Sequence, residues 1–184
     1  MKYTMALVLA LLMAWSAGAA AQQTKTMTMT DFSGEWVMNV EKSGFEQDRE
    51  GHRRLNNPIT MTVTQDDKEL VVVRMRKGRD GEDVKTILTY SLKGKKTKNK
   101  TDFGTMESTV KWIEEGTKLE LVSSTEVKRE GMKFNVENLQ TWSLDGDVLT
   151  IDTVRNTPRG EIKSTAVYER KGTQTRAAEE KEKE

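Results

Sequence analysis

The feature that most constrains this fold is a hydrophobic period of two. Between Gly34 and Tyr168, apolar residues recur at every second position in nine short segments. This alternation is typical of half-buried β-strands, because successive side chains of a strand point to opposite faces. The predicted strands cover 34–40, 59–64, 71–76, 84–92, 106–112, 119–127, 132–142, 148–154 and 162–168.

Two of these segments carry apolar residues on both faces. In the segment 71–76, Val71, Val73 and Met75 alternate with a face made of Val72, Arg74 and Arg76. In the segment 148–154, we expect the alternating set Val148, Thr150, Asp152 and Val154, while Leu149 and Ile151 compete for the inner face.

The connections between the predicted strands are short and have the composition of turns. Asp, Asn, Gly or Pro stands at breaks such as 78–83, 144–147 and 157–160, which is hairpin chemistry. Short turns join antiparallel neighbours, so the chain is predicted to be all-β, an up-and-down meander of about nine or ten strands. A twisted sheet of that size favours closure into a barrel, which also removes exposed edges.

One segment, 41–58, lacks this period. Ser43 and Glu46 have the spacing of a capping box. The sequence therefore predicts one short helix from Gly44 to about Glu50, between the first two strands, where it would cover one mouth of the barrel.

The two ends of the chain differ from the middle. A basic Lys2, an apolar run and small residues ending at Ala21 predict a secretory signal peptide over 1–21. The barrel domain is predicted over 31–171, and residues 172–184 form a charged tail of disordered type. The expected location is periplasmic or secreted. The sequence contains no Cys, so neither disulfides nor an N-terminal lipid anchor is expected.

The charge balance argues against nucleic acid as a partner. Without Lys2, the only charged residue of the leader, the chain has 29 basic and 29 acidic residues spread along its length. The local exception is the lysine-rich segment 93–100, which is predicted to be a solvated loop. Its alternative is a weak contact with an anionic surface. No apolar run after the leader is long enough to span a membrane.

The sequence offers little for catalysis. It has one histidine, His52, in a polar connection, and no nucleophile motif, phosphate-binding loop or spaced metal ligands. Asp80, Glu82 and Asp83 are too few oxygen ligands for a calcium loop and suit a hairpin turn. We therefore expect no enzyme activity, no metal and no cofactor.

The predicted inner face of the later strands is mixed. Apolar Leu119, Leu121, Phe134 and Trp142 share it with polar residues, and buried polar groups need partners. Two explanations remain open: the interior holds water and a ligand, or bulges flip the register so that the polar groups face solvent. The polar residues are Ser123, Thr125, Asn138, Gln140 and Thr150.

The segment Gly34-Glu35-Trp36, on the first strand after a leader and before a meander, resembles the calycin superfamily of lipocalins and fatty-acid-binding proteins. "GEWVMNVEKS" is similar to the start of small exported bacterial lipocalin-like proteins. The resemblance implies that Gly34 and Trp36 lie at the closed end of the barrel. It also implies that a basic residue stacks over Trp36, with Arg170 as the first candidate and Arg155 as the second.

The resemblance also has a gap. Fatty-acid-binding proteins carry an Arg-x-Tyr pair on the last strand that grips a carboxylate. Here Tyr168 matches the tyrosine, but Ala166 stands at the arginine position, so carboxylate recognition is not implied.

We expect an exported barrel that binds a small apolar or amphipathic ligand as a carrier or sequestering protein. The alternative is a ligand-free barrel that acts as a protein-interaction module of the cell envelope. Apolar side chains would form the walls of the ligand site, and polar ones would orient the ligand. The walls would be Trp112, Met132, Phe134, Trp142 and Tyr168, and the orienting groups Ser123, Thr125, Asn138 and Gln140.

Overall fold

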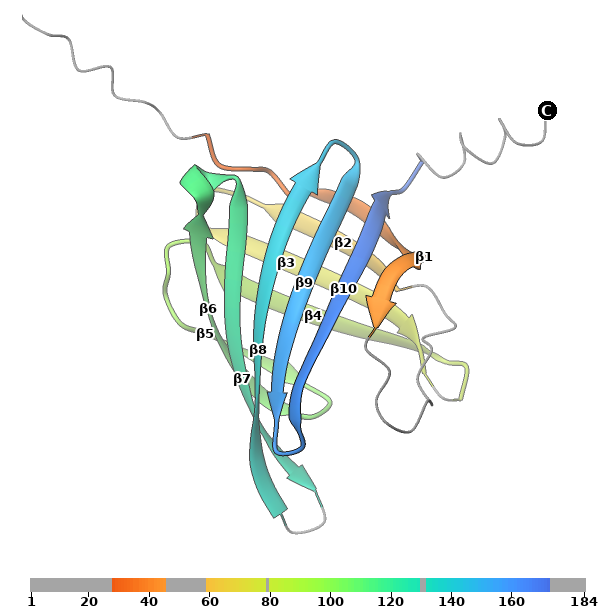
Figure 1. Cartoon of the computed structure of the whole chain (residues 1–184), viewed down its shortest axis with the longest axis vertical. Helices are drawn as coiled ribbons and strands as arrows, with labels where there is room; N and C mark the ends of the chain where they lie inside the picture. Colours follow the sequence, from red (N-terminus) through yellow and green to blue (C-terminus); the bar gives the residue numbers. More distant parts are fainter. Residues whose placement is uncertain (1–27, 46–58, 79, 130–131, 173–184) are drawn as a thin grey trace, which may run out of the picture.

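A computed structural model describes residues 28–45, 59–78, 80–129 and 132–172. They form a single ten-stranded antiparallel sheet that curls into a nearly closed barrel (Figure 1). Around the barrel the strands follow the order β4-β3-β2-β1-β10-β9-β8-β7-β6-β5. The all-β meander and its barrel shape were therefore predicted correctly. The predicted signal peptide, and the predicted tail beyond Gly172, lie outside the described residues.

The strands are joined mainly by tight turns, and the short 3₁₀ turn η1 connects β6 to β7. Their bounds are β1 Gly34–Phe45, β2 Thr60–Gln65, β3 Glu69–Lys77, β4 Asp83–Ser91, β5 Thr97–Thr101, β6 Gly104–Ile113, η1 Glu114–Gly116, β7 Lys118–Arg129, β8 Met132–Asp145, β9 Val148–Thr157 and β10 Gly160–Arg170.

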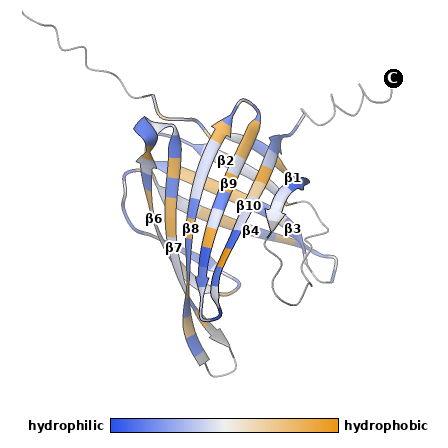
Figure 2. Cartoon of the chain, viewed as in Figure 1, coloured by the Kyte–Doolittle hydropathy of each residue, from blue (hydrophilic) through white to orange (hydrophobic). Residues whose placement is uncertain are grey.

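The alternation of the sequence becomes the two faces of this barrel. Figure 2 shows apolar and polar residues alternating along the strands. In β2, for example, Met61 and Val63 are buried while Thr60, Thr62 and Thr64 are exposed. The buried apolar residues form one core cluster inside the barrel: Phe32, Trp36, Met38, Met61, Val63, Leu70, Val72, Leu88, Tyr90, Val110, Leu119, Leu121, Trp142, Leu149, Ile151 and Tyr168.

The predicted helix after the first strand is wrong where the structure describes it. Gly44 and Phe45 are the end of β1 and pair with Thr165 and Ser164 of β10. Ser43 does not cap a helix, because its hydroxyl donates to the Asn39 carbonyl at 2.6 Å and accepts from the Val167 amide at 3.0 Å. These bonds hold a bulge between Asn39 and Gly44. The rest of the predicted helix lies outside the described residues.

The lysine-rich segment is partly a strand. Thr97 to Thr101 form β5 and pair with β6, which the hydrophobic pattern did not predict because the segment has no apolar residue. Its outward Lys98 and the neighbouring Lys96 contact Glu107 of β6 at 2.9 and 3.0 Å. Their hydrogen bonds lower the pKa of the Glu107 carboxyl to about 2.

In the two strands with apolar residues on both faces, pairing with the neighbouring strands decides which face turns inward. In β9, Leu149 and Ile151 are buried because they pair with the inward residues Tyr168 and Trp142. Of the two sets that competed for the inner face, Leu149 and Ile151 therefore occupy it, while Val148, Thr150, Asp152 and Val154 face outward.

In β3 the inner face carries Leu70, Val72 and Arg74. Val72 pairs with buried Val63, and Arg74 pairs with buried Met61. Directly paired residues of an antiparallel sheet share a face, so the apolar set beginning at Val71 faces outward.

The barrel closes between its two edge strands through a side chain. The amide of Asn99, on β5, accepts from the Thr89 N–H at 2.8 Å and donates to the Thr89 carbonyl at 2.9 Å on β4. Where β4 and β5 separate, the Asn99 side chain thus replaces the backbone hydrogen bonds that join neighbouring strands. Asn99 is only 7% exposed.

Candidate functional site

One end of the barrel is closed by the segment that precedes β1. Trp36 is fully buried, and its indole N–H donates to the Phe32 carbonyl at 3.1 Å. The Arg170 guanidinium lies 4.4 Å from the centre of the Trp36 ring, a cation–π arrangement. Arg170 also donates to the Ser33 carbonyl at 3.0 Å and to the Asp147 carboxylate at 2.8 Å.

Gly34 is positioned by this stack. Its φ is +145°, and a Cβ at that position would collide with the Arg170 guanidinium. Only glycine tolerates both the backbone angle and the close approach. Gly34, Trp36 and Arg170 therefore lie together, at the end of the barrel where β1 begins and β10 ends.

Phe32, which the sequence analysis did not single out, completes this closed end. Its ring is stacked on Trp112 at 6.0 Å between ring centroids and meets Trp142 edge-on at 5.9 Å. Its backbone N–H donates to the Gln65 side chain at 3.1 Å. Two of the residues predicted to form ligand walls, Trp112 and Trp142, thus pack against Phe32 at the closed end. The signal for Phe32 was an apolar residue in phase with Gly34 and Trp36.

Away from the closed end, the interior becomes polar. β7 and β8 pair without a register shift from Lys118 to Arg129, so no bulge turns the polar residues outward. Ser123 and Thr125 are 4% and 8% exposed and lie inside the barrel. Thr150 is the exception, because it lies on the outward face of β9 opposite Ser143.

Asn138 and Gln140 share this inward face of β8, and both are engaged. The Asn138 side-chain oxygen accepts from Arg155 at 2.8 Å, and the Gln140 oxygen accepts from the Trp142 indole at 3.2 Å. Phe134 is half-buried opposite Val127, toward the far tip of the β7–β8 hairpin. Met132 begins β8, and its side chain lies outside the described part of the chain.

The inner hydroxyls have no partner in the described chain. No hydrogen bond to another described residue is made by the side-chain hydroxyls of Ser123, Thr125, Tyr90 and Tyr168. Among all the described residues, Nε of Arg74 is the only fully buried side-chain N or O atom without a hydrogen-bond partner. The four hydroxyl oxygens are not among such fully buried atoms, although their residues are at most 8% exposed.

Arg74 was not predicted as a site residue. It lies on the inner face of β3 between Met61 on β2 and Thr86 on β4. Burial raises the pKa of the Tyr90 and Tyr168 hydroxyls above the ordinary value, while the positive charge of Arg74 acts on both in the opposite direction. The three consecutive valines, 71–73, left the orientation of the arginine undetermined in the sequence. Pairing with β2 determines it, because Arg74 lies opposite the buried Met61 while the threonines of β2 face outward.

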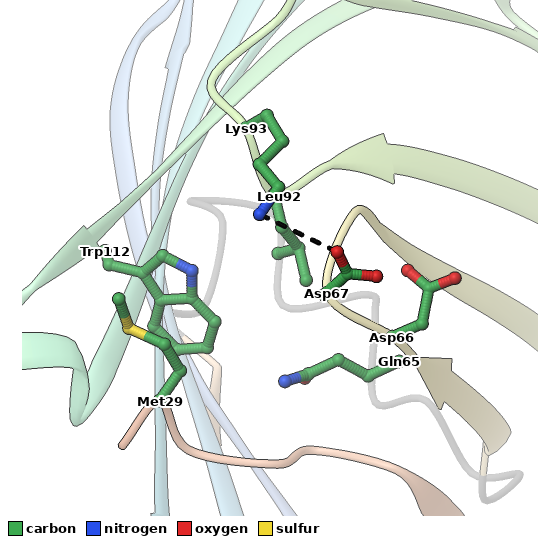
Figure 3. A pocket seen from close by; sticks show the side chains of 7 residues that line it. All are labelled: Met29, Gln65, Asp66, Asp67, Leu92, Lys93 and Trp112. Atoms are coloured by element: carbon green, nitrogen blue, oxygen red, sulfur yellow. Dashed lines mark ion pairs between the residues drawn. The ribbon is translucent and has the colours of Figure 1, made fainter. Parts of the chain in front are cut away.

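A pocket of about 320 Å³ lies at the closed end, between the segment before β1 and the turns β2–β3 and β4–β5 (Figure 3). Of the predicted site residues only Trp112 lines it. Its rim carries Lys93 and Asp67, whose charged atoms are 4.0 Å apart. The lining residues are Met29, Gln65, Asp66, Asp67, Leu92, Lys93 and Trp112.

The described residues contain no cluster of three His, Cys, Asp or Glu side chains that could hold a metal ion. Within the same residues, no helix has the length and apolar character to cross a membrane.

Comparison with known proteins supports the fold. No protein-family model matches the chain, and no curated protein matches it. Among solved structures, it is similar to fatty-acid-binding protein 1 of Echinococcus granulosus, at 14% identity and a TM-score of 0.51 over 77% of this chain and 98% of that one.

It is similar to a secretary abundant heat soluble protein of Ramazzottius varieornatus, at 10% identity and a TM-score of 0.51 over 78% of this chain and 98% of that one. It is also similar to zebrafish ileal bile acid-binding protein complexed with cholic acid, at 13% identity and a TM-score of 0.48 over 76% and 98%. The two structures with a TM-score of 0.51 show that this chain shares their barrel fold.

Proposed function

We propose that this chain is an exported carrier or sequestering protein that binds a small apolar or amphipathic molecule inside its barrel. The observation that carries the proposal is the set of inner hydroxyls. Ser123 and Thr125 are buried on the inner face of the barrel, and their hydroxyls have no hydrogen-bond partner in the described chain. A packed core would leave such groups unsatisfied at a cost of about 1–3 kcal/mol each. A cavity with a few convergent polar groups is the usual form of a ligand site.

The fold adds weaker support. One structure with the same barrel is named a fatty-acid-binding protein, which is consistent with an interior suited to apolar ligands. The closed end built from Phe32, Trp36 and Trp142 is fully buried and aromatic, while the middle of the barrel is polar. A ligand with an apolar part and a polar part fits such a lining.

The test is to fill the interior. Ser123 and Ser124 are neighbours on β7 with side chains on opposite faces, Ser123 inside and Ser124 outside opposite Glu107 and Glu137. Ser123→Phe and Ser124→Phe therefore add the same volume to the two faces. We expect the full chain to bind the neutral fluorescent probe N-phenyl-1-naphthylamine saturably. Ser123→Phe should remain folded and lose at least about tenfold in affinity, while Ser124→Phe should bind like the parent.

Two results would overturn the proposal. One is a parent chain that shows no saturable probe binding. The other is a Ser123→Phe variant that is destabilised by about 1–3 kcal/mol, the usual cost of overpacking a filled core. Native mass spectrometry of protein purified from its own host would then identify the bound molecule.

Export is tested separately. We expect protein recovered from the periplasm or the medium to begin at Gln22, because the small residues Ala19 and Ala21 precede it in the spacing of a signal-peptide cleavage site. Cytoplasmic recovery of the chain with Met1 intact would refute this part of the proposal.

A further inference from the structure

We propose that Arg74, together with Tyr90 and Tyr168, holds the carboxylate head group of an amphipathic ligand inside the barrel. This inference rests on the proposed function and names the chemical class of the ligand. It assigns the head-group contact to β3, and not to position 166 on the last strand, where the chain has alanine.

The first step is the position of Arg74. Its two cross-strand partners are Met61, which is 1% exposed, and Thr86 on the inner face of β4. The inner residue that precedes it on β3, Val72, is fully buried. The guanidinium therefore extends from the inner face of the sheet, and its Nε is completely buried.

The second step is that Arg74 differs from the other arginines near the interior. Arg76 pairs with Asp102 at 3.2 Å, Arg155 donates to Asn138 at 2.8 Å, and Arg170 pairs with Asp147 at 2.8 Å. Arg74 makes no hydrogen bond or ion pair with any residue in the described part of the chain.

The third step is the absence of an anion among the neighbouring inner residues. From β2 to β10, every Asp and Glu within the strands occupies an outward position in the alternating register. Arginine stays charged at all accessible pH values, and a buried charge without a partner is costly. A ligand that brings a negative charge to this point removes that cost.

The fourth step is the match between the groups. A guanidinium presents its N–H donors as a planar fork, which fits the two oxygens of a carboxylate. Tyr90 and Tyr168 are 2% and 3% exposed, their hydroxyls lack partners in the described chain, and both are close enough to feel the charge of Arg74. These two inward O–H groups are the donors that we assign to the same anion.

The experiment compares two probes with the same tail. cis-Parinaric acid and its methyl ester are both fluorescent, and only the acid carries a charge. We expect the full chain to bind the acid about tenfold to a hundredfold more tightly than the ester, as hydrogen bonds to a charged group imply. Arg74→Met should abolish that preference and leave ester binding within about twofold of the parent.

Arg76→Met is the matched control. It removes an arginine from the same face of the same strand, two residues away, whose charge is already paired with Asp102. It should keep the preference for the acid. Arg74→Lys, which keeps the charge and loses the fork, should keep part of it.

A structural role for Arg74 predicts something different. If the arginine had a partner within the chain, Arg74→Met would unfold at lower denaturant than the parent. We expect an equal or higher midpoint without ligand, because an unpaired charge is removed. A lower midpoint would overturn the inference.

The remaining outcomes separate the two proposals. Equal binding of acid and ester by the parent overturns the carboxylate site and leaves ligand binding intact. Failure of the parent to bind the acid, the ester and the neutral naphthylamine overturns both.

Discussion

Replacing Asn99 by alanine should open the junction between β4 and β5. The change removes both hydrogen bonds to Thr89, at 2.8 and 2.9 Å, and leaves one backbone N–H and one carbonyl without partners. Each buried group left unsatisfied costs about 1–3 kcal/mol. Since Asn99 lies at the seam of the barrel, where water can reach part of the freed backbone, we expect the free energy of unfolding to fall by about 2–4 kcal/mol.

Urea unfolding followed by tryptophan fluorescence measures this loss, and amide exchange at Thr89 locates it. The matched control is Asn135→Ala, on an exposed position of β8 where the asparagine makes no side-chain hydrogen bond to a described residue. It should change the free energy of unfolding by no more than about 0.5 kcal/mol. The reasoning fails if the two variants are equally stable, or if the Thr89 amide is as well protected in Asn99→Ala as in the parent.

Three further predictions concern Phe32 and Gly34 at the closed end and Glu107 on the outer surface. Phe32→Ala should cost about 3–5 kcal/mol in urea unfolding because a fully buried ring is lost, whereas Phe103→Ala, at a ring that is 69% exposed, should cost almost nothing. The Glu107 carboxyl has a folded pKa of about 2 against an ordinary 4.5, so its contribution to stability is present above pH 4.5 and is lost as pH falls to 2; Glu107→Gln should unfold more easily than the parent at neutral pH, and the difference should vanish near pH 2. Gly34→Ala should lower the thermal midpoint by several degrees and Gly146→Ala by much less, because only at Gly34 would the new methyl group meet another side chain.

Much of the barrel could be predicted because its signals are local. Strand positions such as 59–64 and 119–127 followed from the period of two, and the hairpins followed from turn chemistry. β5 escaped prediction because its inner residues, Thr97 and Asn99, are polar like its outer lysines. A hydrophobic period cannot appear where neither face is apolar.

The candidate site was only partly accessible from the sequence. The inward orientation of Ser123, Thr125, Asn138 and Gln140 followed from their phase with Leu121 and Trp142, and the unbroken register of β7 with β8 decided between the two explanations for them. Their role in binding stays a prediction. Arg74 was missed because the valines around it fit either face equally well.

The sequence by itself determined the elements. Alternation and turn residues act over a few positions, so the strands, their antiparallel order and the tryptophan of the first strand can be recognised locally. The tertiary structure alone decided which face of β3 and β9 turns inward, which side chain joins β4 to β5, and which inward arginine is left unpaired. Those choices depend on pairing between residues of different strands, such as Arg74 with Met61 on β2 and Leu149 with Tyr168 on β10. A strand with apolar residues on both faces has no local reason to prefer one orientation until its neighbours are in place.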